Sequence, residues 1–311
     1  MPGPRLSIVV VFHDMAREAP RTLHTLSAAY QRGVDEADYE VIAVDHGSQR
    51  PLDAELVRGH GRQFRLVSHP AGTVPASPAA AINAAVRVSS GDAVAICIDG
   101  ARMASPGIVR HTLAALDAWA DPVVATLGWH LGPKLQNVSM LEGYDQAAED
   151  RLLDSIDWRR EGYDLFTVSC LAGSCGGGWF LPITESNCLA MRRAAYERIG
   201  GFDERFLCPG GGLVGLDFFK RASASANDLV LLLGEGTFHQ FHGGVATNTP
   251  LEVHPYESFH AEYRRLRGEP FAPPHVKPRY LGGMPSQCLP FLRHSVEQAI
   301  NAVPLAAGPR P

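Results

Sequence analysis

A carboxylate that could bind a ligand follows a short apolar run in the first half of the chain. The run Ala93–Ile98 has the length and composition of a strand that is buried on both faces of a sheet. Asp99 follows it directly, and the small residues Gly100 and Ala101 come next. In open α/β sheets, ligands bind at the carboxyl ends of the strands. We therefore expect Asp99 to face a ligand site.

Two earlier apolar runs end in polar residues in the same way. Leu6–Phe12 is followed by His13 and Asp14, and Glu40–Val44 is followed by the polar stretch Asp45–Ser48. Because the carboxyl ends of parallel strands meet at one edge of a sheet, we expect these polar groups to share a site with the carboxylate described above.

The elements that must position these residues alternate between strands and helices. Short connections and this alternation predict a mostly parallel, right-handed α/β sheet of the Rossmann type, flanked by helices. Ser105 and Pro106 are expected to supply an N-cap and a first-turn proline for one helix. We expect strands at 6–12, 40–44, 64–68, 93–98, 123–127, 187–191 and 229–233, and helices at 20–33, 75–88, 105–119, 192–199 and 216–226.

Composition restricts the class of protein. A chain of 311 residues with 45% hydrophobic and 20% charged residues can bury a large core. Its net charge of −5 argues against a nucleic-acid partner. No apolar run approaches the roughly 18 residues of a membrane span, and the N-terminus does not resemble a secretion signal. The six cysteines lack metal-finger spacing, so we expect reduced thiols and a cytoplasmic location.

Five segments, in order, resemble the family 2 glycosyltransferases of the GT-A fold. They are SIVVVFHDM, EVIAVDHGS, AICIDGARMASPG, IGGFDERF and LDFFKR, and the resemblance covers roughly residues 6–245. It implies a GT-A-like α/β fold and the transfer of a sugar from a nucleotide-sugar donor to an acceptor hydroxyl with inversion. It also implies a glycosyltransferase domain at 1–249, with a donor-binding half at 1–130 and an acceptor-binding half at 131–249. After Pro250 the composition shifts toward proline, arginine and aromatic residues, which predicts a helical appendage with a tail at 250–311.

The resemblance implies a nucleotide site at the ends of the first strands. Asp45 would accept a hydrogen bond from a ring N–H of the base, although an Asx-type turn in DHGS is the alternative. Asn83 would reach the ribose or phosphates, unless it is a solvent-facing helical residue. The implied nucleotide-sugar contacts are Phe12, His13, Asp14, Asp45, Gly47, Ser48, Asn83, Asp99, Gly100, Ala101 and Arg102.

The family's D-x-D signature holds a divalent cation, Mn²⁺ or Mg²⁺, against the donor diphosphate. Here Ala101 stands where the second carboxylate is expected, so Arg102 or another ligand would take over its role. A late histidine completes the cation site in several GT-A enzymes, which suggests His242 first and His239 second, both in the predicted loop GEGTFHQFHGG. The alternatives are ordinary loop histidines, or histidines that bind phosphate directly.

Inverting transfer also needs a general base for the acceptor hydroxyl. The family supplies it from an E-D-x-D-L-x-x-R-like stretch, in which Val214 and Gly215 occupy the E-D positions of this chain. Asp217 is therefore the first candidate, with the alternative that it stabilises a helix N-terminus, and Glu185 is the second. Trp179 could stack on a sugar, although packing in the core is the commoner role.

The donor is expected to be a UDP- or dTDP-sugar, and the acceptor a saccharide, a lipid-linked sugar or a small molecule. The other hypothesis is a catalytically degenerate GT-A-fold module that binds nucleotide or sugar. Aromatic residues of the appendage could pack on the core or pair subunits in a homo-oligomer. A peripheral membrane contact stays open, although the basic cluster 262–267 is too short to indicate one.

Overall fold

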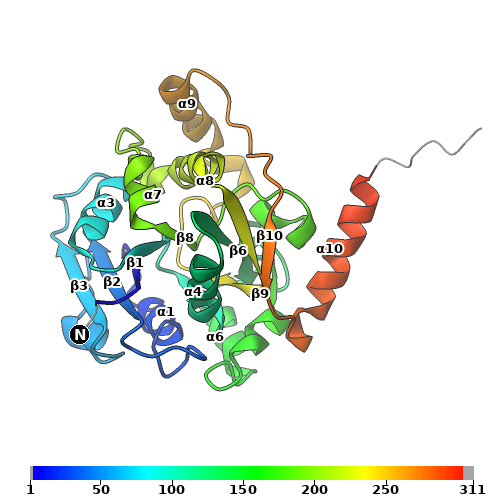
Figure 1. Ribbon diagram of the computed structural model, residues 1–311, viewed down its shortest axis with the longest axis horizontal. Coiled ribbons are helices and arrows are strands. Elements are labelled where there is room, and N and C mark those ends of the chain that lie inside the picture. The colour runs from blue at the N-terminus through cyan, green and yellow to red at the C-terminus, as the bar shows by residue number, and fades with distance from the viewer. Residues whose placement is uncertain (1–2, 304–311) are drawn as a thin grey trace, which may run out of the picture.

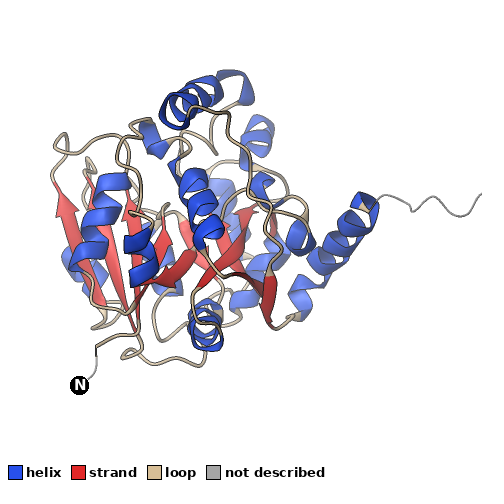
Figure 2. Ribbon diagram, turned by 45° about the horizontal axis from the view of Figure 1, so that its top comes forward, coloured by secondary structure: helices blue, strands red, loops and turns tan. Residues whose placement is uncertain are grey.

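The computed structural model describes residues 3–303 and contains one sheet with helices on both faces (Figures 1 and 2). The strand order is β10-β9-β6-β8-β4-β1-β2-β3, with β5 paired to β9 and β7 paired to β6. The strands are β1 (Leu6–Phe12), β2 (Tyr39–His46), β3 (Phe64–His69), β4 (Ala93–Cys97), β5 (Arg102–Ala104), β6 (Pro122–Leu131), β7 (Ser169–Leu171), β8 (Leu189–Arg192), β9 (Asp228–His239) and β10 (Arg279–Gly282).

Strands β1 to β4 form the expected parallel half of the sheet. Strand β1 lies between β2 and β4, with Leu6 opposite Tyr39 and Ala93, and β3 follows β2 at the edge. Every residue of β1 is buried, because its alternate side chains enter two different cores. The mostly parallel α/β sheet predicted from the sequence is confirmed.

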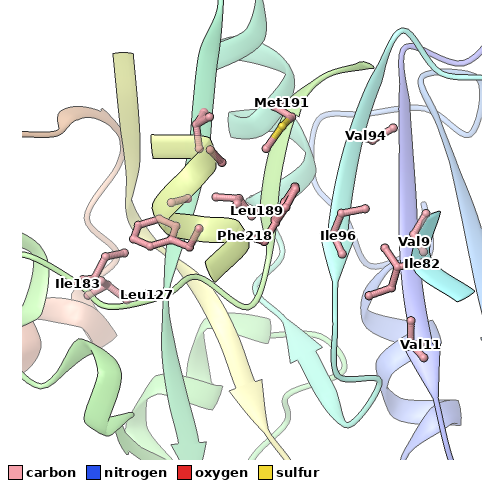
Figure 3. Close-up of a cluster of buried hydrophobic side chains, with 14 of the residues drawn as sticks. Val9, Val11, Ile82, Val94, Ile96, Leu127, Ile183, Leu189, Met191 and Phe218 are labelled. Atoms are coloured by element: carbon pink, nitrogen blue, oxygen red, sulfur yellow. The ribbon is translucent and has the colours of Figure 1, made fainter. Parts of the chain in front are cut away.

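Alternate residues of β1 show how the helices are divided between the two faces. Val9 and Val11 pack in a core with Ile82 of α3 and Phe218 of α8, shown in Figure 3. Helices α1, α2 and α4 cover the other face. The helices are α1 (Ala19–Thr25), α2 (Ala54–Arg58), α3 (Ala79–Val88), α4 (Ile108–Ala118), α5 (Gln136–Ser139), α6 (Gln146–Asp154), α7 (Arg193–Arg198), α8 (Val214–Ser225), α9 (Tyr256–Arg267) and α10 (Leu289–Ala302).

Strand β9 is much longer than the predicted 229–233. It continues through GEGTFH and pairs in parallel with β6 and antiparallel with β5, so that Phe238 lies opposite both Trp129 and Met103. Gly234 and Gly236 weaken the local strand signal, but pairing on both sides compensates for their low propensity. As a result, His239 ends a strand, and its prediction as a loop residue was wrong.

The start of α4 also differs from the prediction. The helix begins at Ile108 with Gly107 as its N-cap residue, and Ser105 does not cap it. The Ser105 hydroxyl instead donates to the carboxylate of Glu235 on β9, and the N–H of Gly107 donates to the same carboxylate. This buried glutamate therefore accepts a hydrogen bond from the backbone at the helix start, a role that Ser105 was expected to fill as the N-cap residue.

The C-terminal segment contains the two helices α9 and α10. It also contains the short strand β10, and the sequence did not predict this strand. Strand β10 extends the sheet in parallel with β9. Phe259 and Tyr263 of α9 are buried, so these two aromatics pack on the core. Helix α10 projects from the body in Figure 1 and contacts it near its middle, where the N–H of Trp179 donates to Ser295 Oγ. Within residues 3–303, no helix is long and apolar enough to span a bilayer.

Candidate active site

The carboxyl end of β4 turns tightly against β1 and thereby places Asp99. A Cβ on Gly100 would lie 2.3 Å from Cδ1 of Phe12 and 2.5 Å from the carbonyl oxygen of Val11, so only glycine fits there. The N–H of the buried Ala101 donates to Asp99 Oδ1 at 3.0 Å. The turn therefore fixes the Asp99 carboxylate at the edge of the sheet, as the sequence predicted.

Three side chains with metal-ligating atoms meet at this edge. Asp99 Oδ2 lies 3.0 Å from Nε2 of His239, and Asp99 Oδ1 lies 3.8 Å from Nε2 of His242. One ligand atom from each residue lies within 4.8 Å of the others. Ligand bonds of about 2.1 Å to a shared ion place neighbouring ligand atoms about 3 to 4 Å apart, so the residues fit a divalent cation. Pairing of β5 with β9, which sets Arg102 opposite His239, brings the groups together.

The protonation state of the cluster suits a metal ion. Burial alone would raise the pKa of Asp99, but the neighbouring His239, His242 and Arg102 hold that pKa well below its usual range. Burial lowers the pKa of His239 to about 4, although Asp99 acts in the opposite direction. Near pH 7 the carboxylate is ionised and the buried imidazole is neutral, which is the protonation state that a metal ion needs.

Arg102 lies behind the carboxylate. Its side chain is only 5% exposed, and its Nε lies 3.4 Å from Asp99 Oδ2. The buried Nε and Nη1 atoms have no hydrogen-bond partner among residues 3–303. A Cβ on Gly128 would stand 3.6 Å from Nη1 and also 3.6 Å from Nδ2 of Asn187. The guanidinium thus supplies a fixed positive charge beside the site.

Asp45 is fully buried at the end of β2. Its Oδ1 accepts from the N–H of Ser48 at 3.0 Å, and its Oδ2 accepts from the N–H of Leu52 at 2.6 Å. Gly47 adopts a φ of +69° in the same turn, and a Cβ there would lie 2.7 Å from Val74. These contacts match the Asx-type turn, the alternative considered for this residue.

The ends of β1 and β2 are joined around His13 and Asp14. The N–H of Asp14 donates to Ser48 Oγ at 2.9 Å, and Nδ1 of His13 lies 2.8 Å from the carbonyl oxygen of His46. His13 and Asp14 keep about half of their side-chain surface exposed, whereas Phe12 is buried. The two exposed side chains are therefore open to a nucleotide, and Phe12 supports them from the core.

Asn83 lies apart from the carboxylate–histidine cluster. Its Oδ1 accepts from the N–H of Phe202 and the hydroxyl of Tyr196, and its Nδ2 donates to the carbonyl of Phe202 and to Glu204. It thus braces the GGFDER segment beside a cavity of about 440 Å³. That cavity is lined by residues 199–205 together with Asn83, Arg221 and Arg267, and by none of the three candidate metal ligands.

The two candidate bases have different surroundings. Asp217 is 1% exposed and accepts hydrogen bonds from Arg221 and Arg267, which occupy both of its carboxylate oxygens. Glu185 is half-buried, and its carboxylate has no hydrogen-bond partner among the described residues. The next residue, Ser186, fixes this segment to β6 through Thr126. Within residues 3–303 the Glu185 carboxylate is therefore unpaired, whereas that of Asp217 is engaged in ion pairs.

The sequence profile of glycosyl transferase family 2 matches residues 7–200. This chain belongs to glycosyl transferase family 2. The match covers the strands that carry the polar ends and stops before His239 and His242. No curated protein matches the chain significantly.

Solved structures agree with the GT-A fold of the family. S. aureus TarS matches with a TM-score of 0.52 and 14% identity over 77% of this chain. This chain covers 37% of that TarS chain, which is less than half of its length. The complex of TarS 1-349 with UDP-GlcNAc gives a TM-score of 0.52 and 14% identity, covering 84% of this chain and 65% of the chain in that complex. At these identities the similarity concerns the fold.

Several residues at the site were not singled out by sequence reasoning. Gln136 of α5 contacts the ring of His239, and Asn248 accepts from the backbone N–H of His242 in the following loop. His130 of β6 packs with its ring centroid 5.3 Å from that of His239, and burial lowers the pKa of His130 to about 2. His130 lies near the end of β6 and Gln136 begins the short helix α5 just after it, so closeness to a strand end was the sequence signal that could have indicated them.

Proposed function

We propose that this family 2 glycosyltransferase transfers a sugar from a UDP- or dTDP-sugar to an acceptor hydroxyl with inversion at the anomeric carbon. The convergence of Asp99, His239 and His242 at the carboxyl edge of the sheet carries the proposal. TarS, which shares the fold, was solved with UDP and with UDP-GlcNAc, and these complexes support a uridine nucleotide as the first donor to test.

The residues at the edge fit a divalent cation, Mn²⁺ or Mg²⁺. The three side chains would hold it, replacing the missing carboxylate at Ala101 with imidazole. When bound, the cation would neutralise negative charge on the leaving diphosphate. Arg102 would add positive charge from behind, and His13 and Asp14 would contact the nucleotide at the surface of the neighbouring strand ends.

Glu185 is the favoured general base, because its carboxylate is partly exposed and has no hydrogen-bond partner among the described residues. Asn187, two residues further on, and Arg102 both pack against Gly128, each 3.6 Å from the position of a Cβ there, so this segment passes near the residue behind the site. In the proposed reaction, Glu185 takes the proton of the acceptor hydroxyl while that oxygen bonds to the anomeric carbon. The bond from the same carbon to the diphosphate oxygen breaks, and its electron pair leaves with the nucleoside diphosphate.

The acceptor class stays as broad as the sequence left it: a saccharide, a lipid-linked sugar or a small molecule. Location in the cytoplasm is part of the proposal, and all six cysteines are free thiols in the structure, as a reducing compartment requires. The second candidate, a degenerate binding module, is favoured by one observation, namely that Ala101, Val214 and Gly215 replace family carboxylates.

Calorimetric titration tests the proposal. UDP, dTDP and GDP are each titrated with and without Mn²⁺ into the full chain and into Asp99→Ala. We expect one nucleotide to bind in the micromolar range only with Mn²⁺. In Asp99→Ala we expect Mn²⁺ to have no effect on the binding of that nucleotide. Hydrolysis or transfer of the matching nucleotide-sugar would then separate an enzyme from a binding module. Absence of nucleotide binding under every condition would refute the proposal.

A further inference from the structure

Gln136 is fully buried between the ends of β6 and β9. Its Nε2 donates to the carbonyl oxygens of Leu131, at 3.3 Å, and of His239, at 2.9 Å. Two carbonyl groups can only accept, so they fix which end of the side-chain amide is the nitrogen. The amide oxygen must therefore point the other way, toward the ring of His239.

The amide oxygen determines which nitrogen of His239 carries the proton. Gln136 Oε1 lies 2.7 Å from Nδ1 of His239 and can only accept, so this Nδ1 is the donor. The neutral ring then has its lone pair on Nε2, and Thr247 Oγ1, 3.2 Å from that atom, can donate to the lone pair only while no cation takes it. Asp99 Oδ2, 3.0 Å from the same Nε2, can only accept. Two acceptors at this distance favour a cation between them.

Asn248 extends the same network to the second histidine. Its Nδ2 donates to Gln136 Oε1 at 2.9 Å, and its Oδ1 accepts from the backbone N–H groups of His242, Gly243 and Gly244 at 3.0 to 3.1 Å. Because three donors fix the oxygen and one acceptor fixes the nitrogen, the orientation of this amide is also determined. The turn that carries His242 is therefore built around Asn248.

We propose that Gln136 and Asn248 are positioning residues that jointly shape the cation site, Gln136 by fixing the tautomer and ring of His239 and Asn248 by fixing the turn of His242. The inference rests on the proposed function, because it assumes that the three ligand atoms hold a cation. Partners behind metal-ligating histidines commonly change metal affinity 10- to 100-fold when they are removed. Neither residue would touch the donor or acceptor.

Binding of Co²⁺ and Mn²⁺ tests the proposal without any turnover. The full chain and its variants Gln136→Leu and Asn248→Ala are titrated with Co²⁺ by visible absorption and with Mn²⁺ by electron paramagnetic resonance. We expect each variant to bind about 10- to 100-fold more weakly than the unaltered protein and to change the Co²⁺ absorption bands. Asn248 lies outside helices and strands, so Asn248→Ala tests the network even where Gln136→Leu folds poorly.

Gln31 offers a matched control. It is also a buried glutamine whose Nε2 donates to two carbonyls, of Thr25 and Ser105, and whose oxygen accepts a backbone N–H, but it does not contact the three ligands. Gln31→Leu should lower the melting temperature and leave metal affinity unchanged. If both network variants bind Co²⁺ and Mn²⁺ like the unaltered protein, the positioning roles are refuted and the cation site stands. If the unaltered protein binds neither metal, the cation site itself fails, and the inference with it.

Discussion

Arg267 donates to both carboxylate oxygens of Asp217, from Nε at 2.6 Å and from Nη2 at 2.7 Å, although the two residues are 50 positions apart. Arg221 donates to the same carboxylate at 2.8 Å and to the carbonyls of Ile199 and Gly201. The Asp217 carboxylate thus joins α8, the GGFDER segment and α9. The ion pairs raise the pKa of Arg267 above its ordinary value, Asp217 being the main cause.

Replacing Asp217 should therefore lower the stability of the folded protein. Asp217→Asn leaves two arginines facing a neutral amide, and we expect a loss of about 3 kcal/mol in the free energy of unfolding, at the low end for broken buried pairs because the arginines are partly exposed. Urea denaturation measures it. Asp228→Asn, which breaks the surface pair with Arg279, is the control and should cost under about 1 kcal/mol. Unchanged stability with a large fall in kcat would instead assign Asp217 to catalysis.

Glu185→Gln should act on turnover and leave the fold intact. Its carboxylate makes no hydrogen bond within residues 3–303, so we expect an unchanged melting temperature and unchanged nucleotide affinity. Loss of a general base lowers kcat by about 100- to 10,000-fold. Steady-state kinetics and calorimetry measure the two effects. Glu142→Gln, which alters an exposed pair with Lys134, is the control. A Glu185 variant with full kcat would exclude this residue as the base.

Gly178 should not tolerate a side chain, because α10 packs directly on it. Its φ is +73°, and a Cβ would lie 2.0 Å from Ser295 Oγ and 3.0 Å from the Cα of Ser295. We expect Gly178→Ala to lose about 1 kcal/mol for the left-handed conformation and about 1 to 3 kcal/mol more for overpacking. Gly200 has a φ of +77° and open space around it, so Gly200→Ala should show only the loss that is due to the left-handed conformation. Equal losses for the two alanine variants would show that α10 does not rest on Gly178.

His130 should make the stability of the protein depend on pH. Burial lowers its pKa to about 2, whereas in the unfolded chain the ordinary value is 6.5. Below pH 6.5 the unfolded chain binds a proton that the folded protein does not, so acid favours unfolding. This part of the stability is complete above pH 6.5 and is lost as the pH falls toward 2.

The measurement is urea denaturation at several pH values between 7 and 5. His130→Gln should remove up to about 1.4 kcal/mol per pH unit from the slope of stability against pH, whatever its effect on stability at pH 7. An unchanged denaturant m value would confirm that the same surface unfolds in both proteins. A slope equal to that of the unaltered protein would contradict the buried, neutral state of His130.

The sequence predicted those features that depend on local patterns. Leu6–Phe12 and Ala93–Ile98 are apolar runs with polar ends, and both proved to be central strands that lead to the site. The pairing of His239 with Asp99 could not be derived in this way, because it follows from two strands that meet 140 positions apart in the chain. Local propensity misplaced His239, since the glycines of β9 resemble a loop until β5 and β6 pair with them.

Long-range partners also decided the surroundings of the other candidates. Asp217 was the first substitute for the missing catalytic carboxylate, and only the folded chain shows Arg267 of α9 beside it. Asn83 appeared free on a helix, whereas Phe202 and Tyr196 hold its amide. A single sequence records the residue types and their order, but such contacts depend on packing between segments that carry no common motif.

The donor set at the site should give it a different metal preference from a site of two carboxylates. Asp99, His239 and His242 offer one oxygen and two imidazole nitrogens. Imidazole suits transition metals, whereas Mg²⁺ prefers oxygen ligands and binds imidazole weakly. We therefore expect Mn²⁺ and Co²⁺ to support nucleotide binding at concentrations at least about 10-fold lower than Mg²⁺. Calorimetry with the nucleotide held constant and the metal varied measures this. His242→Asp, which restores a second carboxylate, should shift the preference toward Mg²⁺, and equal preference before and after that substitution would show that His242 is not a ligand.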